Sequence, residues 1–176
     1  MIYDVLDGPH ALAVIEQLCD LYAEVYAEPP YNEGPQHVAT FADHFTDEVT
    51  RPGFSLVTAT DHDVLAGAVH GWTMKAGRWF RNPLAEPPAE IKNAPKFAVI
   101  EWMVRKRYRG TGVGRQLLDR VLDNRPERYA ILTSNPDSAA RRIYDRLGWR
   151  FMSATRPSDL LPSMDVLVRD LGGNPL

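Results

Sequence analysis

The chain has 176 residues, of which 44% are hydrophobic and 24% charged, with a formal net charge of −3 at pH 7. This length suits one domain with a buried core, and the weak negative charge argues against nucleic-acid or anionic-membrane partners. The single cysteine, Cys19, allows no internal disulfide, and neither a leader segment nor an apolar run of ~20 residues is recognisable. We therefore expect a cytoplasmic protein that does not bind membranes.

The first half of the chain predicts a strand, two helices and an antiparallel hairpin. Apolar residues recur at helical spacing in both helices, and proline-containing segments end them. In chain order, these elements are a strand at Ile2–Leu6, helices at Ala11–Tyr26 and from Pro35 to Thr50, and strands at Phe54–Thr60 and Val64–Thr73.

A long segment without clear periodicity, Met74 to Lys96, separates the two halves. Loops of this length in compact domains are usually functional or disordered. Strands and helices alternate after it, which favours a mixed α/β domain over residues 1–176. The predicted elements are strand Ala98–Val104, helix Val113–Leu122, strand Tyr129–Ser134, helix Ser138–Leu147, and strands Arg150–Ala154 and Asp165–Leu171.

A glycine-rich turn, Arg109-Gly110-Thr111-Gly112-Val113-Gly114, connects a predicted strand to a predicted helix. Glycines let phosphate oxygens approach main-chain N–H groups, and a helix N-terminus adds unpaired donors and a positive dipole end. We therefore expect a phosphate-bearing ligand. The spacing fits neither a P-loop nor the dinucleotide-binding G-x-G-x-x-G motif. The basic residues around the turn favour the same ligand: Arg105, Lys106, Arg107, Arg109 and Arg115.

Two motifs in the second half resemble those of a known family, the GNAT N-acetyltransferases. Arg109-x-x-Gly112-x-Gly114 is similar to the family signature Arg/Gln-x-x-Gly-x-Gly/Ala, with Lys106 at a position where proline is usual. Downstream, the segment from Ala140 to Trp149 is similar to the family pattern A-x-x-x-Y-x-x-x-G-F. The resemblance runs from about Phe97 to Phe151, whereas the first half of the chain matches only in its order of elements.

The resemblance implies a single α/β domain with a mostly antiparallel sheet of about six to seven strands, flanked by about four helices. It also implies a splayed strand pair that holds acetyl-CoA, from which an acetyl or other acyl group passes to a primary amine. The residues expected to bind the cofactor are Met103, Val104, Arg109, Gly110, Thr111, Gly112, Val113, Gly114, Arg115, Asn135 and Ala140.

Two residues are candidates for catalysis. Glu101 is an acidic residue within an apolar strand, where burial would raise its pKa toward that of a useful base. The alternative is that Glu101 faces solvent or pairs with an arginine. Tyr144 matches the family tyrosine near the coenzyme A sulfur, so the resemblance implies a general acid, although a core tyrosine is the alternative. The histidines show no metal-ligand spacing, and we expect no metal.

The acceptor is expected to lie between the connection from Glu28 to Gly34 and the long segment from Met74 to Lys96. Tyr31 and Glu33 offer a ring and a carboxylate that suit a cationic small amine, and Trp79 with Phe80 would form a lid over it. Trp79 and Phe80 could instead anchor the loop or contact a second copy in a homodimer. Two other functions stay open: a non-catalytic acyl-CoA sensor or interaction module, and an acetyltransferase that acts on a protein amine.

Overall fold

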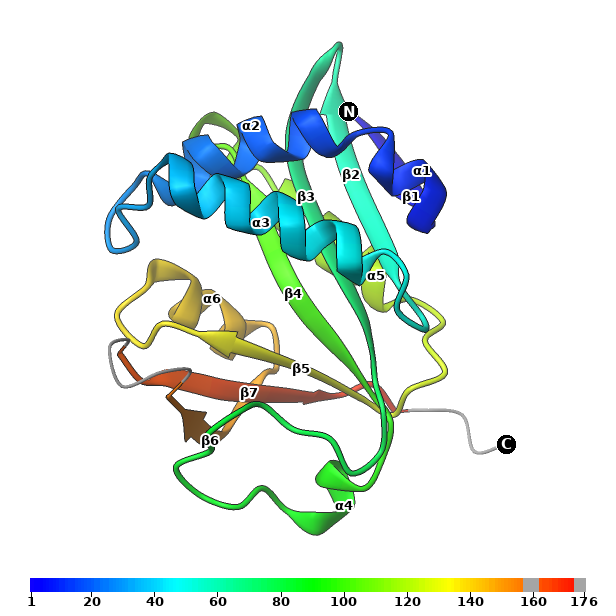
Figure 1. The fold of residues 1–176 in the computed structure, drawn as a ribbon, viewed down its shortest axis with the longest axis vertical. Coiled ribbons are helices and arrows are strands. Elements are labelled where there is room, and N and C mark those ends of the chain that lie inside the picture. The colour runs from blue at the N-terminus through cyan, green and yellow to red at the C-terminus, as the bar shows by residue number, and fades with distance from the viewer. Residues whose placement is uncertain (157–161, 173–176) are drawn as a thin grey trace. The chain divides into compact units, whose positions relative to one another are not determined.

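The computed structural model describes residues 1–156 and 162–172, which contain six α-helices and seven β-strands (Figure 1). The strands are β1 (Ile2–Leu6), β2 (Ser55–Asp61), β3 (Val64–Met74), β4 (Lys96–Val104), β5 (Tyr129–Ser134), β6 (Arg150–Thr155) and β7 (Met164–Asp170). The helices are α1 (Gly8–Leu12), α2 (Ile15–Tyr26), α3 (Pro35–Glu48), α4 (Ala89–Lys92), α5 (Val113–Leu122) and α6 (Ala139–Arg146), with a 3₁₀ turn η1 at Lys106–Tyr108.

The seven strands form one sheet in the order β1-β2-β3-β4-β5-β7-β6. Strand β4 runs parallel to β5, while β1 with β2, β2 with β3, β5 with β7, and β6 with β7 are antiparallel. The mostly antiparallel α/β sheet predicted from the sequence is therefore confirmed. The chain forms two compact units, residues 1–72 with 99–123 and residues 73–98 with 124–176, and β3 and β4 each contribute to both. The single domain remains a prediction.

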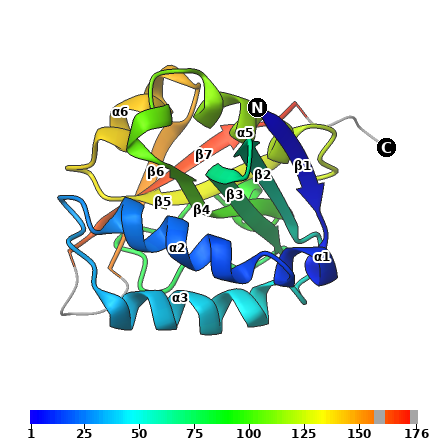
Figure 2. The ribbon, with the colours of Figure 1, turned by 90° about the horizontal axis from the view of Figure 1, so that it is seen from above.

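In the first unit, α2 and α3 run side by side along one face of the strands (Figure 2). Helix α3 begins at Pro35, a residue suited to the first helical turn, and its N-cap Gly34 donates its N–H to His37 Nδ1 at 3.2 Å. Helix α5 packs against β1 and β2. The fully buried side chains between the long helices and the sheet include Leu18, Leu21, Phe45, Leu56 and Met103.

The single helix predicted over Ala11–Tyr26 is wrong, because the structure has α1 and α2 with a break between them. Asp7 caps α1 by accepting the His10 N–H at 3.3 Å, so this helix begins earlier than the apolar pattern indicated. Val14 leaves the helical region at φ −111° and ψ 13°, and α2 starts after it. The apolar spacing continues across the break, and for that reason the sequence pattern did not reveal it.

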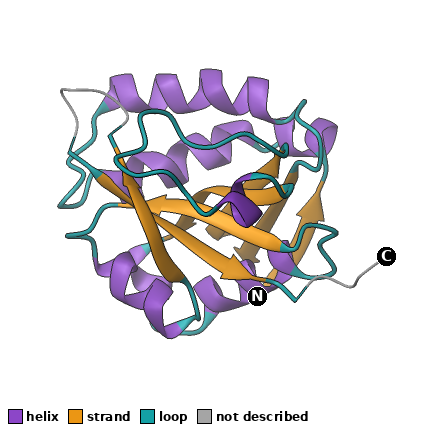
Figure 3. Ribbon diagram, turned by 90° about the horizontal axis from the view of Figure 1, so that it is seen from below, coloured by secondary structure: helices purple, strands orange, loops and turns teal. Residues whose placement is uncertain are grey.

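The long segment before β4 belongs to the second unit and is tied to β6. Leu84 N–H donates to Ala154 O at 2.8 Å, and Arg156 N–H donates to Asn82 O at 3.2 Å. Figure 3 shows that a short helix, α4, interrupts the loop, an element that the sequence analysis did not predict. None of the helices in residues 1–156 and 162–172 has the length and apolar character needed to cross a membrane.

Candidate active site

Glu101 lies on β4 within the first unit, and its carboxylate accepts a hydrogen bond from the Tyr26 hydroxyl of α2. The side chain is half-buried between the strand and the helix. Burial raises the pKa of Glu101 to about 8, with smaller contributions from the charges of Glu48 and Glu33, while the bond from Tyr26 opposes this rise. The alternative of an arginine partner is not found among the hydrogen bonds and ion pairs of the described residues.

Two residues predicted to bind the acceptor lie in the same cluster as Glu101. The Tyr31 ring meets the Tyr26 ring edge-on at 4.9 Å between centroids, and the Glu33 carboxylate accepts the Tyr22 hydroxyl. The Tyr22 and Tyr26 rings lie 4.5 Å apart. We call these five residues the Glu101 cluster. Sequence analysis missed Tyr22 and Tyr26, whose spacing of four residues on one helix face also fits a purely apolar core.

The glycine turn adopts the backbone that its sequence predicted. Gly110 and Gly112 have φ of 78° and 92°, a left-handed conformation that side chains disfavour, and Gly112 is the N-cap of α5. A Cβ built on Gly112 would meet no protein atom within 4 Å, so the space beside this helix N-terminus is open. The main-chain N–H groups of the first helical turn have no partner within a helix, and they can therefore receive an anion there.

Gly114 packs against Trp102 of β4. A Cβ at this position would lie 3.0 Å from the Trp102 ring, and the Trp102 indole N–H donates to Gly114 O at 3.1 Å. Gly114 therefore permits close packing of α5 on β4. A side chain at Gly114 would therefore meet the strand, while the contact of Gly114 with the cofactor stays a prediction.

The basic residues around the turn are largely paired with carboxylates. Arg109 Nε donates to Val104 O at 2.9 Å, and its two terminal nitrogens bind the Glu28 carboxylate at 3.0 and 3.1 Å. Arg105 pairs with Glu24 and also donates to Leu65 O at 2.8 Å. The Arg109 guanidinium thus fixes the turn against the end of β4.

Thr111, Val113 and Arg115 complete the turn without a common role. Thr111 donates its hydroxyl to Tyr108 O at 2.7 Å, which closes the turn on η1. Val113 is buried, and Arg115 pairs with Asp119 at 3.4 Å on the exposed face of α5. Met103 is fully buried, with its carbonyl close to Gly67 of β3.

In the second unit, Tyr144 is 7% exposed on α6, and its ring meets the Trp149 ring edge-on at 5.8 Å. The Tyr144 ring therefore packs in the core, which is the alternative that the sequence analysis left open. This packing leaves the hydroxyl role untested. Trp149 N–H donates to Tyr144 O at 3.1 Å, which ends α6 at the glycine of the second motif, Gly148, with φ of 81°.

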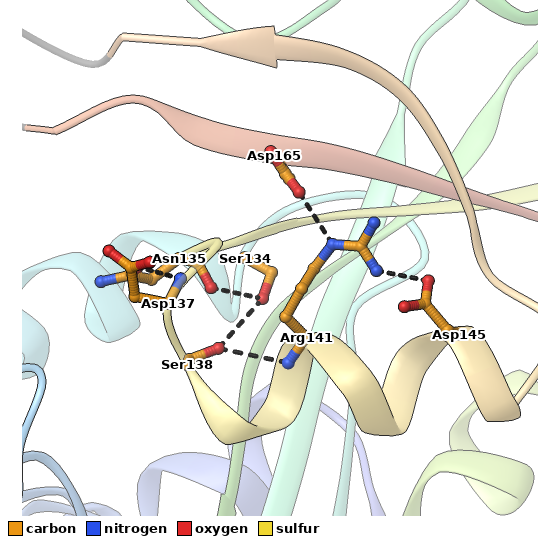
Figure 4. A network of polar contacts seen from close by, with 7 residues as sticks. All are labelled: Ser134, Asn135, Asp137, Ser138, Arg141, Asp145 and Asp165. Carbon is orange, nitrogen blue, oxygen red and sulfur yellow. Dashed lines mark hydrogen bonds and ion pairs between the residues drawn. The ribbon is translucent and has the colours of Figure 1, made fainter.

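The segment that leads into α6 is held by polar contacts, shown in Figure 4. Asn135 Oδ1 accepts the Asp137 N–H at 2.9 Å, and Ser138 caps α6 by accepting the Arg141 N–H at 3.2 Å. Arg141 Nε donates to Asp165 of β7 at 2.8 Å. Asn135 thus shapes the turn with its own side chain, and Ala140, predicted to bind the cofactor, lies half-buried in the first turn of α6.

Trp79 and Phe80 pack within the second unit. Their ring centroids lie 6.1 Å apart, and the fully buried Lys96 ammonium lies 5.7 Å from the Trp79 ring centroid. Lys96 donates to the carbonyls of Lys92 and Ala94, both at 2.9 Å, and burial lowers its pKa to about 8. These contacts favour the alternative in which the aromatic pair anchors the loop, whereas a lid function is untested.

Within residues 1–156 and 162–172, no group of three or more His, Cys, Asp or Glu side chains could hold a metal ion. One of the five histidines, His70, is fully buried on β3, and its Nε2 lies 2.9 Å from the Glu48 carboxylate at the end of α3. The sequence could not predict this burial, because a hairpin pattern indicates that side chains alternate between the two faces of the sheet but does not indicate how deeply each face is buried.

Comparisons with known proteins agree with this architecture. Residues 89–165 match the sequence profile of the Acetyltransferase (GNAT) domain. The fold is similar to that of aminoglycoside 6'-acetyltransferase type Ii, with a TM-score of 0.67, 15% identity, and coverage of 99% of this chain and 100% of that chain. A PaiA N-acetyltransferase from Thermoplasma acidophilum in complex with coenzyme A gives a TM-score of 0.64 at 12% identity, covering 97% and 99%. No curated protein sequence matches the chain.

Proposed function

We propose that this chain is an acyl-CoA-dependent N-acyltransferase, because its fold is that of the GNAT acetyltransferases and residues 89–165 match the GNAT domain. It transfers an acetyl group from acetyl-CoA to a primary amine of a small acceptor by direct attack in a ternary complex. The observation that carries this proposal is the Glu101 carboxyl, half-buried on β4 and bonded to Tyr26, in the unit that also holds the glycine turn.

The turn fits the phosphate groups of coenzyme A. Gly112 opens onto free space at the N-terminus of α5, and the glycines on both sides of Thr111 are left-handed. The unpaired main-chain N–H groups of a helix N-terminus suit an anion. Gly110, Thr111, Gly112 and Val113 would hold the pyrophosphate. Acyl-CoA, when bound, would supply the thioester whose acyl group is transferred, and free coenzyme A would leave as the thiol.

Glu101 takes the proton that the amine must lose before it can attack a thioester. With a pKa of about 8, its carboxyl is largely protonated at pH 7 and becomes a base as the pH rises. The Tyr26 hydroxyl holds the carboxylate in place by its hydrogen bond. In the second unit, Tyr144 is assigned the role of acid toward the departing thiolate. Main-chain N–H groups near Met103 and Val104 are assigned to the oxyanion.

The acceptor is proposed to be a cationic small amine held by Tyr31 and Glu33. A carboxylate and an aromatic face stabilise an ammonium group. Tyr31 contacts Tyr26, and Glu33 accepts a hydrogen bond from Tyr22, so both side chains belong to the Glu101 cluster. Two of the structural neighbours are aminoglycoside 6'-acetyltransferases, and an aminoglycoside is a small-molecule amine, which supports this class. Glu33→Gln is expected to raise KM for the amine and to leave coenzyme A affinity unchanged, whereas Glu16→Gln on the exposed side of α2 changes neither.

A panel of amines assayed with acetyl-CoA, monitored by release of free thiol, tests the function. Thiol release that depends on a small amine and falls by about 10²–10⁴-fold in Glu101→Gln supports the proposal. Tight coenzyme A binding without turnover on any amine would favour a sensor or interaction module. Turnover confined to lysine-containing peptides or proteins would instead identify a protein amine as the acceptor.

A further inference from the structure

The two carboxylates of the Glu101 cluster are each fixed by a tyrosine of α2, and these tyrosines are one helical turn apart. The Tyr22 hydroxyl donates to Glu33, and the Tyr26 hydroxyl donates to Glu101. The two tyrosine ring centroids lie 4.5 Å apart, and the Glu33 main-chain N–H donates to Tyr26 O at 2.9 Å. Residues four apart on a helix are separated by about 6 Å along its axis, so the tyrosines hold the two carboxylates at a spacing of that order.

Among the residues that the structure describes, neither of these carboxylates is paired with a cation. The side chains of Glu33 and Glu101 accept hydrogen bonds from the two tyrosine hydroxyls, and their ion pairs with arginine, lysine or histidine are absent from this part of the chain. Glu28, near the end of α2, differs, because it pairs with Arg109 at 3.0 Å. A cationic acceptor would therefore meet two carboxylates without a countercharge, whereas an anionic acceptor would be repelled.

The two carboxylates have different tasks in the proposed transfer. Glu101 takes a proton from the reacting amine, whereas Glu33 takes no part in proton transfer and can hold a group that stays charged. Burial raises the pKa of Tyr22 above its ordinary value, with further contributions from its bond to Glu33 and from the charges of Glu101 and Glu33. Tyr22 therefore keeps the hydrogen that it donates, and this donor holds Glu33 beside the ring of Tyr26.

We propose that the acceptor is a primary diamine, of which one nitrogen reacts beside Glu101 while the other stays an ammonium bound by Glu33. The inference rests on the proposed function and narrows its acceptor to a molecule with two amino groups about 6 Å apart, the span of a four-carbon chain. The reacting ammonium loses two protons: Glu101 takes one and the other ends on the leaving sulfur, while the amide C–N bond forms and the thioester C–S bond breaks. The second ammonium keeps its charge and makes a charge-assisted hydrogen bond.

The test compares 1,4-diaminobutane with butylamine, which has the same carbon chain and one amino group. With acetyl-CoA as donor and thiol release as the readout, we expect kcat/KM for the diamine to be higher by about tenfold or more, which exceeds the twofold effect of two equivalent nitrogens. Glu33→Gln is expected to remove this preference by raising KM for the diamine alone. Glu16→Gln removes an exposed carboxylate from the same helix as Tyr22 and is expected to keep the preference.

Tyr22→Phe gives a second variant that leaves Glu33 in place. The phenylalanine ring can keep the stacking on Phe41, whose centroid lies 4.6 Å from that of Tyr22, but the donor that fixes Glu33 is lost. We expect the preference for the diamine to fall in this variant, and to fall less than in Glu33→Gln. Calorimetry of both amines on protein saturated with coenzyme A supplies a readout that does not depend on turnover.

The outcomes separate this inference from the proposed function. Equal kcat/KM values for the two amines would overturn the inference and leave the function standing, as would an equal rise of KM for both amines in Glu33→Gln, because Glu33 would then bind the reacting ammonium itself. Tighter binding of the diamine that depends on Glu33, without thiol release, would uphold the site for two ammonium groups and reject the transfer. Equal binding of both amines without thiol release would reject both.

Discussion

Tyr26 of α2 donates its hydroxyl hydrogen to the carboxylate of Glu101 on β4, which joins residues 75 positions apart in the sequence. The donor stabilises the ionised carboxyl, while burial of the same group opposes ionisation more strongly. The two effects together leave Glu101 able to exchange a proton close to neutral pH. Catalysis by this residue is therefore expected to depend on pH in a way that point variants can shift.

Tyr26→Phe is expected to move the acid limb of kcat/KM to higher pH. Loss of the hydroxyl removes the interaction that lowers the pKa of Glu101, so the carboxyl ionises later as the pH rises. The ring contacts of Tyr26 with Tyr22 and Tyr31 remain. Tyr3→Phe in the same unit serves as the control, and a limb that stays in place in Tyr26→Phe would contradict the assignment.

Glu101→Gln is expected to gain thermal stability relative to the unsubstituted protein as the pH rises from about 4.5 to about 8. The folded pKa of Glu101 lies above its unfolded value, so the carboxyl contributes stability below pH 4.5 that is lost as the pH rises through 8. Glutamine does not titrate, so the variant does not lose this stability as the pH rises. Paired melting temperatures at pH 5 and pH 8.5 measure the effect, and a difference that is the same at both pH values would rule it out.

Gly112→Ala is expected to weaken coenzyme A binding by about tenfold or more, or ~1.4 kcal/mol. The added methyl enters the open space at the α5 N-terminus where a phosphate would lie. A left-handed alanine costs about 1–2 kcal/mol of folding energy, so the control must carry the same strain. Gly148→Ala has φ of 81° and equally open surroundings, and calorimetry should find its coenzyme A affinity unchanged.

Tyr144→Phe is expected to lower kcat by about 10²–10⁴-fold with little change in coenzyme A affinity. The variant keeps the ring that packs against Trp149, so the fold should persist. Tyr129→Phe removes the hydroxyl of another buried tyrosine of the second unit and is the matched control. Equal kcat values for both variants, with chemistry shown to limit the rate, would assign Tyr144 to the core alone.

The free energy of unfolding of Lys96→Met, relative to that of the unsubstituted protein, is expected to fall as the pH rises from 7 to 10. Burial depresses the pKa of Lys96 to about 8, below its unfolded value of 10.5, so the penalty for the charged group is present at low pH and fades above pH 8. Denaturant melts across this range measure the trend. A stability difference that does not change with pH would show that Lys96 acts through its two carbonyl contacts alone.

Local sequence determined the elements whose causes are local. The helix Val113–Leu122 and the strand Tyr129–Ser134 were predicted with the bounds that the structure has, because apolar periodicity and flanking turn residues fix both ends. The glycine turn was predicted for the same reason, since a left-handed backbone requires glycine wherever the rest of the chain lies. The break at Val14 was not predicted, because an apolar repeat continues across it.

Tertiary structure alone decided the environment of each candidate side chain. The sequence placed Glu101 in an apolar strand, but only folding brought Tyr26 to its carboxylate and Glu48 near enough to raise its pKa. It also placed Gly114 against Trp102 and paired Arg109 with Glu28, two contacts that the motif did not predict. The burial of a side chain and the charges near it depend on residues that are distant in the chain. A sequence pattern identifies the side chain but does not show which residues surround it in the fold.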